Sequence, residues 1–319
     1  MGYHFGELDK DLEMSKTKIA IKQIRTDRGA FMASIISNFF CWLPDATYLK
    51  LLYRFKMGHQ LNLKNPQTFT EKLQWLKLYN RKPEYHTMVD KYAVKQYVAN
   101  IIGEDYIIPT LGVWDKPEEI DCDLLPKQFV LKTTHGGGGC GVVICKDKES
   151  FDRNAAIDKL NESLASDIYR GLREWPYKNV PKRIIAEKFL SSEESAAPID
   201  LLDFKFFCFN GKVKFFKVDF GRFVEHHANY YDTDGKLLPF GEKSYEPDSA
   251  HIIELPNNLR EMILLAERLS KKEPFLRVDF YNVNGTIFFG ELTFYPASGM
   301  GKWTTEEADS IIGAYLYVY

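Results

Sequence analysis

The chain has 319 residues, of which 45% are hydrophobic and 27% are charged, as is ordinary for a soluble globular protein. This length allows two domains, or one domain with substantial subdomains. The net charge of −2 gives no global basic field and argues against a nucleic-acid partner. The five cysteines are scattered, without a CxxC pair, which argues against a zinc site or a disulfide framework and favours a reducing, cytoplasmic compartment.

The N-terminal region, residues 1–68, is predicted to be mainly helical and carries no chemical motif. It begins with acidic residues and lacks the apolar segment of a signal peptide. The apolar patch at 30–43 is too short and too polar to span a bilayer, so we favour a buried helix. The neighbouring basic residues Lys50, Arg54 and Lys56 leave open an alternative, peripheral docking on the inner face of the membrane.

Two helices and a strand are predicted next. Apolar spacing indicates an amphipathic helix at 70–79, with Thr70 near its N-cap. A second helix at 92–102 follows, and Gly103 is suited to end it. Residues 107–113 are typical of a strand.

A glycine-rich stretch at 129–143 reads FVLKTTHGGGGCGVV, which predicts a strand, a loop and a second strand. Lys132 enters the loop with a charge suited to phosphate, and His135 is a candidate contact to phosphate or substrate. The stretch matches neither a P-loop nor a dinucleotide fingerprint. A plain hairpin tip is the alternative, but consecutive glycines lose much conformational entropy, so we favour a phosphate-binding loop. Its glycines are Gly136, Gly137, Gly138 and Gly139.

The remaining predicted elements are a helix at 151–169, a strand at 183–190, a hairpin at 203–220, a helix at 259–269, a hairpin at 277–294, and a final helix preceded by a capping box at 304–307. Strands therefore alternate with helices first, and hairpins packed with helices follow. This order predicts an α+β fold with a ligand crevice between the two parts.

The second hairpin carries the most informative charges. Arg277 and Asp279 are two residues apart on one strand and so share a face. Pairing around the Asn-Gly turn brings the regions of Asp279 and Glu291, which lies on the return strand, near each other across the ladder. Two facing carboxylates predict a cation between them, and Mg²⁺ accepts one or two carboxylates together with phosphate oxygens. A merely solvent-facing charged strand is the alternative, but the flanking residues are apolar.

Weaker signals lie at the end of the strand before the hairpins. Glu187 and Lys188 stand just ahead of a polar turn, where backbone groups suit an adenine edge and Glu193 or Glu194 would lie near a ribose. Lys205, on the first hairpin, is an ambiguous candidate for the nucleotide. A charged strand end is commonplace, so none of these signals is specific alone.

The adjacent histidines His226 and His227 are candidate acid, base or substrate contacts. On a strand they would point to opposite faces, so at most one serves a given site. We favour loop histidines over a catalytic role. No Ser/His/Asp grouping is present.

Together these motifs resemble the ATP-grasp superfamily. DKYAVKQYV, IIPTLGVWD, FVLKTTHGGGG and FGELTFYPASGM look most like its TupA-like branch, which is associated with bacterial surface polysaccharides. The similarity covers residues 69–313. It implies two α+β subdomains that clamp ATP, at 69–190 and 191–319, behind the helical region.

The resemblance also implies roles for the nucleotide contacts. Lys91 and Lys132 would contact the ATP phosphates, and the glycine loop would close over them. The adenine hinge would be Glu187, Lys188, Phe189 and Leu190.

For the metal, Asp279 and Glu291 would hold Mg²⁺, with Arg277 steadying the acylphosphate transition state. Thr293 stands where many relatives have a metal-binding asparagine, which puts the geometry of a second metal in doubt.

The chemistry that the resemblance implies is carboxylate–amine ligation. A carboxylate attacks the γ-phosphate to give an acylphosphate and ADP, and an amine then displaces phosphate. The branch suggests a uronic-acid carboxylate of a glycan or its precursor, coupled to an amino acid. A sugar phosphotransferase, a glycosyltransferase and a nucleotide-binding protein without turnover are the alternatives, although no DxD motif marks a sugar-nucleotide site.

Overall fold

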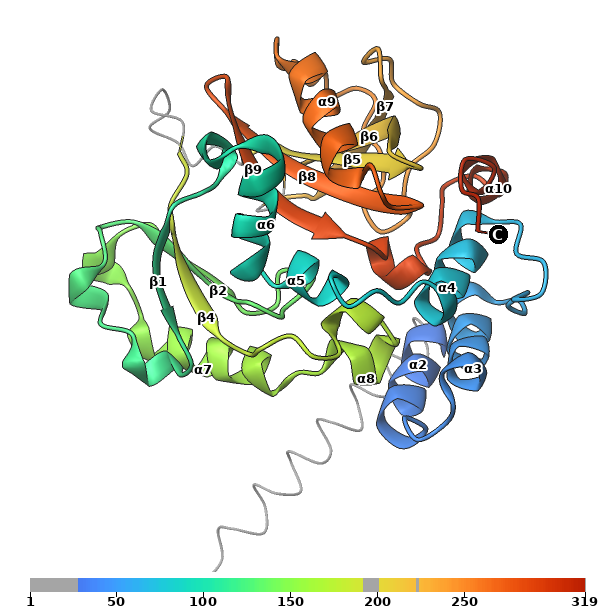
Figure 1. Cartoon of the computed structure of the whole chain (residues 1–319), viewed down its shortest axis with the longest axis horizontal. Helices are drawn as coiled ribbons and strands as arrows, with labels where there is room; N and C mark the ends of the chain where they lie inside the picture. The colour runs from blue at the N-terminus through green and yellow to red at the C-terminus, as the bar shows by residue number, and fades with distance from the viewer. Residues whose placement is uncertain (1–27, 192–200, 222–223, 319) are drawn as a thin grey trace, which may run out of the picture.

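The computed structural model describes residues 28–191, 201–221 and 224–318 (Figure 1). Its helices are α2 (Arg28–Phe39), α3 (Asp45–Met57), α4 (Phe69–Tyr79), α5 (Tyr85–Val89), α6 (Ala93–Ile102), α7 (Arg153–Ala165), α8 (Ile168–Leu172), α9 (Leu259–Ser270) and α10 (Ala308–Gly313). Its strands are β1 (Thr110–Trp114), β2 (Phe129–Thr133), β3 (Val142–Cys145), β4 (Ile184–Lys188), β5 (Asp203–Phe209), β6 (Lys212–Phe220), β7 (His227–Asp232), β8 (Phe275–Val283) and β9 (Thr286–Thr293). The predicted α+β class is confirmed.

The smaller sheet, sheet A, has the strand order β1-β4-β2-β3, and all its pairs are antiparallel. The glycine-rich stretch forms the β2–β3 hairpin, as predicted. Helix α7 packs on this hairpin, and the core between them contains Phe129, Leu131 and Leu160. Strand β4 comes from much later in the chain and inserts between β1 and β2.

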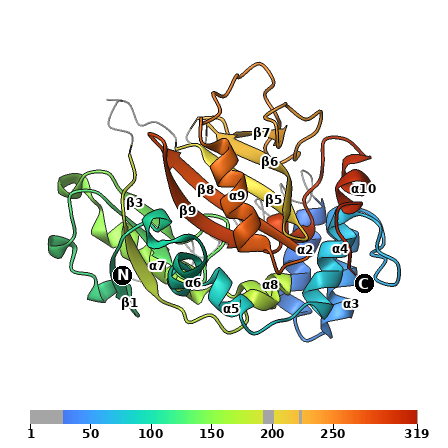
Figure 2. The same cartoon turned by 45° about the horizontal axis from the view of Figure 1, so that its top comes forward.

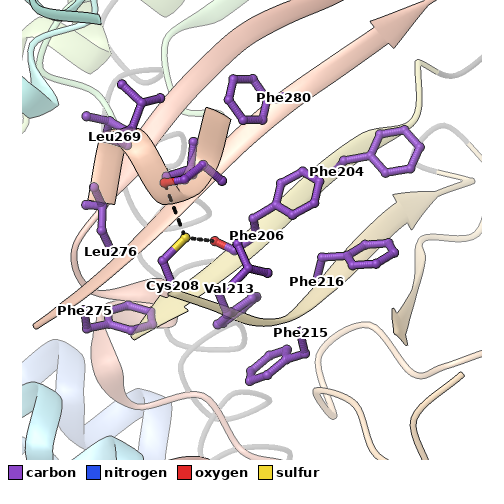
Figure 3. Close-up of a cluster of buried hydrophobic side chains, with 14 of the residues drawn as sticks. Phe204, Phe206, Cys208, Val213, Phe215, Phe216, Leu269, Phe275, Leu276 and Phe280 are labelled. Atoms are coloured by element: carbon purple, nitrogen blue, oxygen red, sulfur yellow. Dashed lines mark hydrogen bonds between the residues drawn. The ribbon is translucent and has the colours of Figure 1, made fainter. Parts of the chain in front are cut away.

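The larger sheet, sheet B, has the order β7-β6-β5-β8-β9. Its two predicted hairpins turn at Asn210-Gly211 and Asn284-Gly285, where all four residues have positive φ. One face is apolar and packs on α9; the Cys208 thiol, for example, donates to the Ala266 carbonyl oxygen of that helix (Figure 3). The opposite face carries charged side chains at alternate positions, as the two-residue period of a strand requires.

The helices before sheet A divide between two cores. Helices α2 and α3 pack on each other around Ile36, Leu49 and Leu52. Helices α4, α5 and α6 join the core of sheet B, where Phe69 contacts the Phe275 ring at a centroid distance of 5.0 Å. Figure 2 shows α5 and α6 between the labelled strands of the two sheets. Among the described residues, no helix has the length and apolar character needed to cross a membrane.

Three local predictions are wrong. The helix expected at 151–169 is two helices, α7 and α8, because the Asp167 carboxylate caps α8 at the Arg170 N–H and restarts the helix there. Helix α4 begins one residue earlier than expected, and Thr68 caps it in a capping box with Glu71.

The third wrong prediction is the capping box expected before the final helix. Helix α10 begins at Ala308 without a side-chain cap. The Thr304 hydroxyl instead accepts from the Gly241 N–H at 3.0 Å, so a tertiary contact takes the group that the local pattern assigned to the helix.

Candidate nucleotide and metal site

Three lysines on the sheet A side surround one buried carboxylate. Glu187 of β4 lies 2.6 Å from Lys132 Nζ of β2 and 2.5 Å from Lys95 Nζ of α6. The register explains the first contact, because Glu187 is opposite Val130, beside Lys132 on the same strand. Burial alone would raise the pKa of Glu187, but the charges of Lys132 and Lys95 outweigh it and lower that pKa.

The third lysine, Lys91, ties the segment before α6 to the glycine hairpin. Its N–H donates to the Thr134 carbonyl at 2.9 Å, and its ammonium donates to the Gly136 carbonyl. Asp90 beside it accepts from the Tyr92 N–H at 2.9 Å and pairs with Arg183, so this acidic residue orders the start of the helix. Burial lowers the pKa of Lys91.

The glycine hairpin needs glycine because its base is crowded. The Thr133 and Ser163 hydroxyls hydrogen-bond at 2.8 Å beneath it. A methyl group at Gly136 would lie 2.5 Å from Thr133 Oγ1, and one at Gly141 would overlap Ser163. At the apex, Gly138 and Gly139 have positive φ and open space around them.

The charged face of sheet B presents the predicted carboxylates. Asp279 of β8 lies directly opposite Glu291 of β9, and a register shift between Asp279 and Phe280 makes these two residues, which the sequence predicted to lie near each other, direct partners. Arg277 donates to both oxygens of Asp279 at 2.7 Å and to Glu291 at 2.9 Å. The Thr293 hydroxyl also accepts from Arg277, at 3.0 Å, and donates to Glu291. One guanidinium therefore holds the carboxylate pair together.

Lys205 of β5 completes this group. Its ammonium pairs with Asp203, lies 3.0 Å from Asp279 and lies 3.4 Å from Asp219 of β6. Burial would lower the pKa of Lys205, but the charges of Asp203 and Asp279 outweigh it and raise that pKa.

Charged groups from both sheets interact at Glu291. Burial alone would raise the pKa of this carboxylate, but the charges of Lys91 and Arg277 outweigh it and lower the pKa to about 2. The charge of Glu291 also acts on Lys132, so two of the three lysines on the sheet A side interact with the β8–β9 hairpin. The predicted phosphate contacts and the predicted metal carboxylates thus come together from distant parts of the chain.

The Asp279–Glu291 pair supplies part of a binding site for a hard cation. Within the residues that the structure describes, no group of three or more His, Cys, Asp or Glu side chains is arranged for a metal ion. Two carboxylates are nevertheless what Mg²⁺ uses when phosphate oxygens and water supply its other ligands. Asp279 and Glu291 therefore fit a Mg²⁺ that arrives with a nucleotide.

The other predicted residues are spread more widely. His135 is buried behind the hairpin, where its Nε2 donates to the Ser163 carbonyl at 3.2 Å, and burial lowers its pKa. Lys188 is exposed at the end of β4, with its N–H donating to the Pro109 carbonyl at 3.0 Å. Phe189 and Leu190 are half-buried. Glu194 lies outside the described residues.

Sequence reasoning missed Lys95. It lies in α6, four residues after Lys91, which precedes that helix, and this interval was the available signal. Asp203 was noted for sharing a face with Lys205, but only Lys205 was a candidate for the nucleotide.

Lysines on the sheet A side and paired carboxylates on sheet B are the groups that suit nucleotide phosphates and their metal, the pattern of the ATP-grasp class. More narrowly, the chain matches the model of the TupA-like ATPgrasp family over residues 71–317 and belongs to that family. ATP-grasp families consist of ATP-dependent ligases. The resemblance seen in the sequence is thereby confirmed.

Solved structures similar to this chain include ATP-grasp ligases of low identity. D-alanine–D-alanine ligase from Bacillus anthracis complexed with ATP shares 17% identity over 65% of this chain and 54% of its own, with a TM-score of 0.37. The corresponding Helicobacter pylori ligase shares 15% over 72% of this chain and 63% of its own, with a TM-score of 0.40. The chain thus matches less than two thirds of these ligases' length. No match is found among curated proteins.

Proposed function

We propose that this protein is an ATP-dependent carboxylate–amine ligase that forms an amide through an acylphosphate. One observation carries the proposal: Lys91 and Lys132 both interact electrostatically with Glu291, the partner of Asp279, so cations suited to phosphate lie near carboxylates suited to a metal. Phosphoryl transfer depends on such positioned charges more than on a protein nucleophile.

The ATP phosphates would lie between the sheets in this proposal. Residues 69–190 would supply the lysines and the glycine hairpin, and residues 191–319 would supply the carboxylates. Lys132 and Lys95 would exchange part of their pairing with Glu187 for phosphate oxygens. The backbone around Lys188, Phe189 and Leu190 would border the adenine, with Glu194 near the ribose.

Bound Mg²⁺ would neutralise charge on the phosphate oxygens that Asp279 and Glu291 face. Arg277, already held between these carboxylates, would stabilise the transferring phosphoryl group, and Lys205 would stand on its other side. His135 would act from behind the hairpin as a contact to the loop or phosphate.

For substrates, we propose a uronic-acid carboxylate of a bacterial surface glycan or its precursor, and an amino acid or other amine. The family supports this choice, whereas the charge pattern supports phosphoryl transfer alone. The protein would work in the cytoplasm.

Docking at the inner face of the membrane is part of the same proposal. The α2–α3 turn exposes 70% of Phe39 and 74% of Trp42, and exposed Lys50 and Arg54 follow on α3. Aromatic and basic side chains together favour a membrane interface that carries anionic lipids. A lipid-linked glycan precursor would be found there.

Nucleotide binding is the first experiment. Thermal unfolding of the wild type and of Lys132→Ala is measured with and without saturating Mg²⁺-ATP. Ligand at about 100 times its Kd stabilises a protein by about 2.7 kcal/mol, so we expect a wild-type shift of a few degrees that is absent in the variant. No shift with any nucleotide would refute the proposal.

Product analysis then separates the reaction classes. A panel of uronic acids and amino acids is incubated with Mg²⁺-ATP, and ADP and inorganic phosphate are measured. Release of both only when acid and amine are present together supports the ligase. ADP with a stable phosphorylated sugar would indicate a phosphotransferase, and transfer from a sugar nucleotide without ADP release would indicate a glycosyltransferase.

A further inference from the structure

Left-handed backbone conformations at residues other than glycine mark two short segments of the molecule. Among the described residues, positive φ is found at Arg173, Asn210, Asn284, Ala297 and Ser298. The two asparagines lie in the hairpin turns, which require it. Arg173 ends α8, where glycine is usual, and Ala297 and Ser298 follow each other in one turn. A Cβ atom makes this conformation unfavourable, so contacts from elsewhere in the molecule impose it.

The side chain of Lys77 on α4 joins both segments. Its ammonium donates to the Leu172 carbonyl at 2.9 Å, and to the carbonyl and the hydroxyl of Ser298, both at 2.8 Å. Leu172 directly precedes Arg173, and Ser298 lies in the short helical turn η6 (Pro296–Gly299). Lys77 is fully buried. One buried ammonium therefore holds the two left-handed segments against each other.

Two further side chains support the η6 turn. The Gln74 side-chain amide, three residues before Lys77, donates to the Ser298 carbonyl at 3.1 Å and to the Gly299 carbonyl at 2.8 Å. A methyl group at Gly299 would lie 2.5 Å from Gln74 Nε2, so the turn fits closely on α4. The buried Glu174, which follows α8, hydrogen-bonds the Ser298 side chain. The η6 turn is thus held from both α4 and the end of α8.

A fully buried ammonium destabilises a fold unless its contacts compensate for the lost water. Burial lowers the pKa of Lys77 to about 8, although the charge of Glu174 favours the protonated form. Apolar residues of similar volume often stabilise such a place at least as well as an ion pair does. The directed hydrogen bonds of Lys77 therefore favour a role in orientation over a role in stability.

The η6 turn leads directly to the proposed metal site. Only Phe294 and Tyr295 separate it from β9, and both are buried. Because this connection is short and tightly packed, a shift of η6 would displace Thr293 and Glu291 at the end of β9. These two side chains accept from Arg277 at 3.0 Å and 2.9 Å. The strained turn is therefore coupled to the carboxylate proposed to hold Mg²⁺.

The segment after α8 leads to the same place. Glu174 is followed by the short helical turn η5 (Trp175–Tyr177), and the chain then continues to β4, the strand that carries Glu187. Burial and the charges of Glu174 and Glu291 raise the pKa of Tyr177 in this turn. Lys77 thus lies where the segments that lead to the two sides of the proposed site meet.

We propose that Lys77 is a positioning residue for the proposed metal site. It holds the η6 turn in its left-handed conformation against the end of α8, and so keeps Glu291 aligned with Asp279 for a cation that arrives with the nucleotide. The effect passes through the backbone of η6 and β9. This role rests on the proposed function, because it presupposes the Mg²⁺ site.

Lys72, on the same helix, provides a matched control. Its ammonium donates to the Gly313 and Leu316 carbonyls at 2.9 Å and 3.0 Å, so it also ties α4 to a later segment, but not to the η6 turn. Wild type, Lys77→Met and Lys72→Met are each titrated with Mg²⁺ at one saturating ATP concentration. The readout is the Mg²⁺ concentration that gives half of the Mg²⁺-dependent increase in the ATP-induced thermal shift.

We expect Lys77→Met to require about tenfold more Mg²⁺ than the wild type, and Lys72→Met to stay within about twofold. Both variants should melt at a lower temperature, so a loss of stability alone does not produce this difference. An unchanged Mg²⁺ requirement in Lys77→Met, or an equal increase in Lys72→Met, would overturn the inference while leaving the ligase proposal standing. A wild type without any ATP-induced shift would instead refute the proposed function, on which the role of Lys77 depends.

Ala297 offers a rescue that a purely structural role of Lys77 would not show. Its side chain is exposed, and glycine adopts its φ of 47° without strain. The double variant Lys77→Met/Ala297→Gly should therefore return to within about threefold of the wild-type Mg²⁺ requirement, because the turn no longer has to be held. A double variant that behaves like Lys77→Met would show that the strain of η6 is not what Lys77 controls, and would overturn the inference.

Ser298→Ala keeps the test decisive if Lys77→Met does not fold. It removes one of the three acceptors of Lys77 and leaves the ammonium and the turn backbone in place. We expect the Mg²⁺ requirement to rise by about threefold, and Ala297→Gly to reverse the rise. A folded Ser298→Ala protein with the wild-type Mg²⁺ requirement would contradict the positioning role.

Discussion

The buried charged side chains of the two sheets differ in their predominant sign. On the sheet A side, three cations surround one carboxylate; they are Lys91, Lys95 and Lys132, around Glu187. On sheet B, Asp279 and Glu291 share Arg277, and Lys205 pairs with Asp203, Asp219 and Asp279. Lysines therefore predominate on the sheet A side, and carboxylates predominate on sheet B.

This difference has a physical consequence for ligand binding. Buried charges are destabilising unless they are paired, so each excess favours a ligand that balances it. Phosphate oxygens balance the lysines, and a divalent cation balances the carboxylates. Mg²⁺-ATP brings both in one molecule, which is why the two sides need to face each other.

The largest expected effect is at Asp279. Asp279→Asn removes one of the two facing carboxylates while keeping the side-chain volume, so we expect turnover to fall by about 10³-fold or more. A readout that requires no substrate is the ATP-induced thermal shift, measured with Mg²⁺ and with EDTA. The wild type should show a larger shift with Mg²⁺, and the variant should show the same shift in both.

Asp203→Asn is the matched control for this experiment. Asp203 pairs with the same Lys205 but lies opposite Tyr281 on β8, away from Glu291. It should retain the Mg²⁺ dependence of the wild type. A Mg²⁺ dependence that survives in Asp279→Asn would remove the metal assignment from sheet B.

Glu187 allows the opposite side to be tested. Glu187→Gln leaves the buried lysines without their carboxylate, so we expect the nucleotide-free protein to lose about 3 kcal/mol of unfolding free energy. Phosphates would no longer compete with Glu187, so the Mg²⁺-ATP shift should grow. Chemical denaturation and thermal unfolding with ligand measure the two effects.

The control here is an ion pair whose lysine is exposed. Glu267 lies 2.8 Å from Lys212, whose side chain is 69% exposed, so Glu267→Gln should change stability by about 1 kcal/mol or less and leave the ATP shift unchanged. If the ATP shift shrinks in Glu187→Gln, this carboxylate orients the lysines for phosphate instead of competing for them.

The sequence predicted sheet B better than sheet A, for a physical reason. The Asn284-Gly285 turn sets the register of its hairpin locally, so the sequence predicts that Asp279 and Glu291 lie near each other; a register shift between Asp279 and Phe280 then makes Glu291, and not Gly290, the direct partner of Asp279. Sheet A depends on β4 inserting between β1 and β2, and no local turn specifies that insertion. The sequence therefore did not predict the contacts of Glu187 with Lys95 and Lys132.

Local capping signals failed where tertiary contacts competed for the same group. Thr304 satisfies the Gly241 N–H instead of a helix end. Periodicity predicts that Asp167 lies inside one continuous helix, but its carboxylate accepts from the Arg170 N–H and caps a new helix. Periodicity finds the apolar face of a helix, whereas a single polar side chain decides where that helix is interrupted.

A smaller effect is expected at the glycine hairpin of sheet A. A methyl group at Gly136 would lie 2.5 Å from Thr133 Oγ1 and 3.0 Å from the Cys140 carbonyl oxygen. At Gly137 the nearest described neighbour is Ile168 Cδ1 at 3.4 Å. Gly136→Ala should thus shift the loop and weaken ATP binding about tenfold, while Gly137→Ala stays within about twofold. Equal affinities in titration calorimetry would show that the base of the hairpin does not position the phosphates.

The smallest effect is expected at the proposed adenine hinge, where a substitution tests whether the side chain or the backbone contacts the nucleotide. Lys188 follows Glu187 directly, but its side chain is exposed, and its N–H already donates to the Pro109 carbonyl. An adenine bordered by the neighbouring backbone would gain little from the Lys188 ammonium. Lys188→Ala should therefore change the ATP shift by no more than about 0.5 kcal/mol in equivalent stabilisation, with the preference for ATP over GTP retained. A loss comparable to that of Lys132→Ala would mean that a fourth lysine contacts phosphate, and the excess of cations on the sheet A side would then extend to the end of β4.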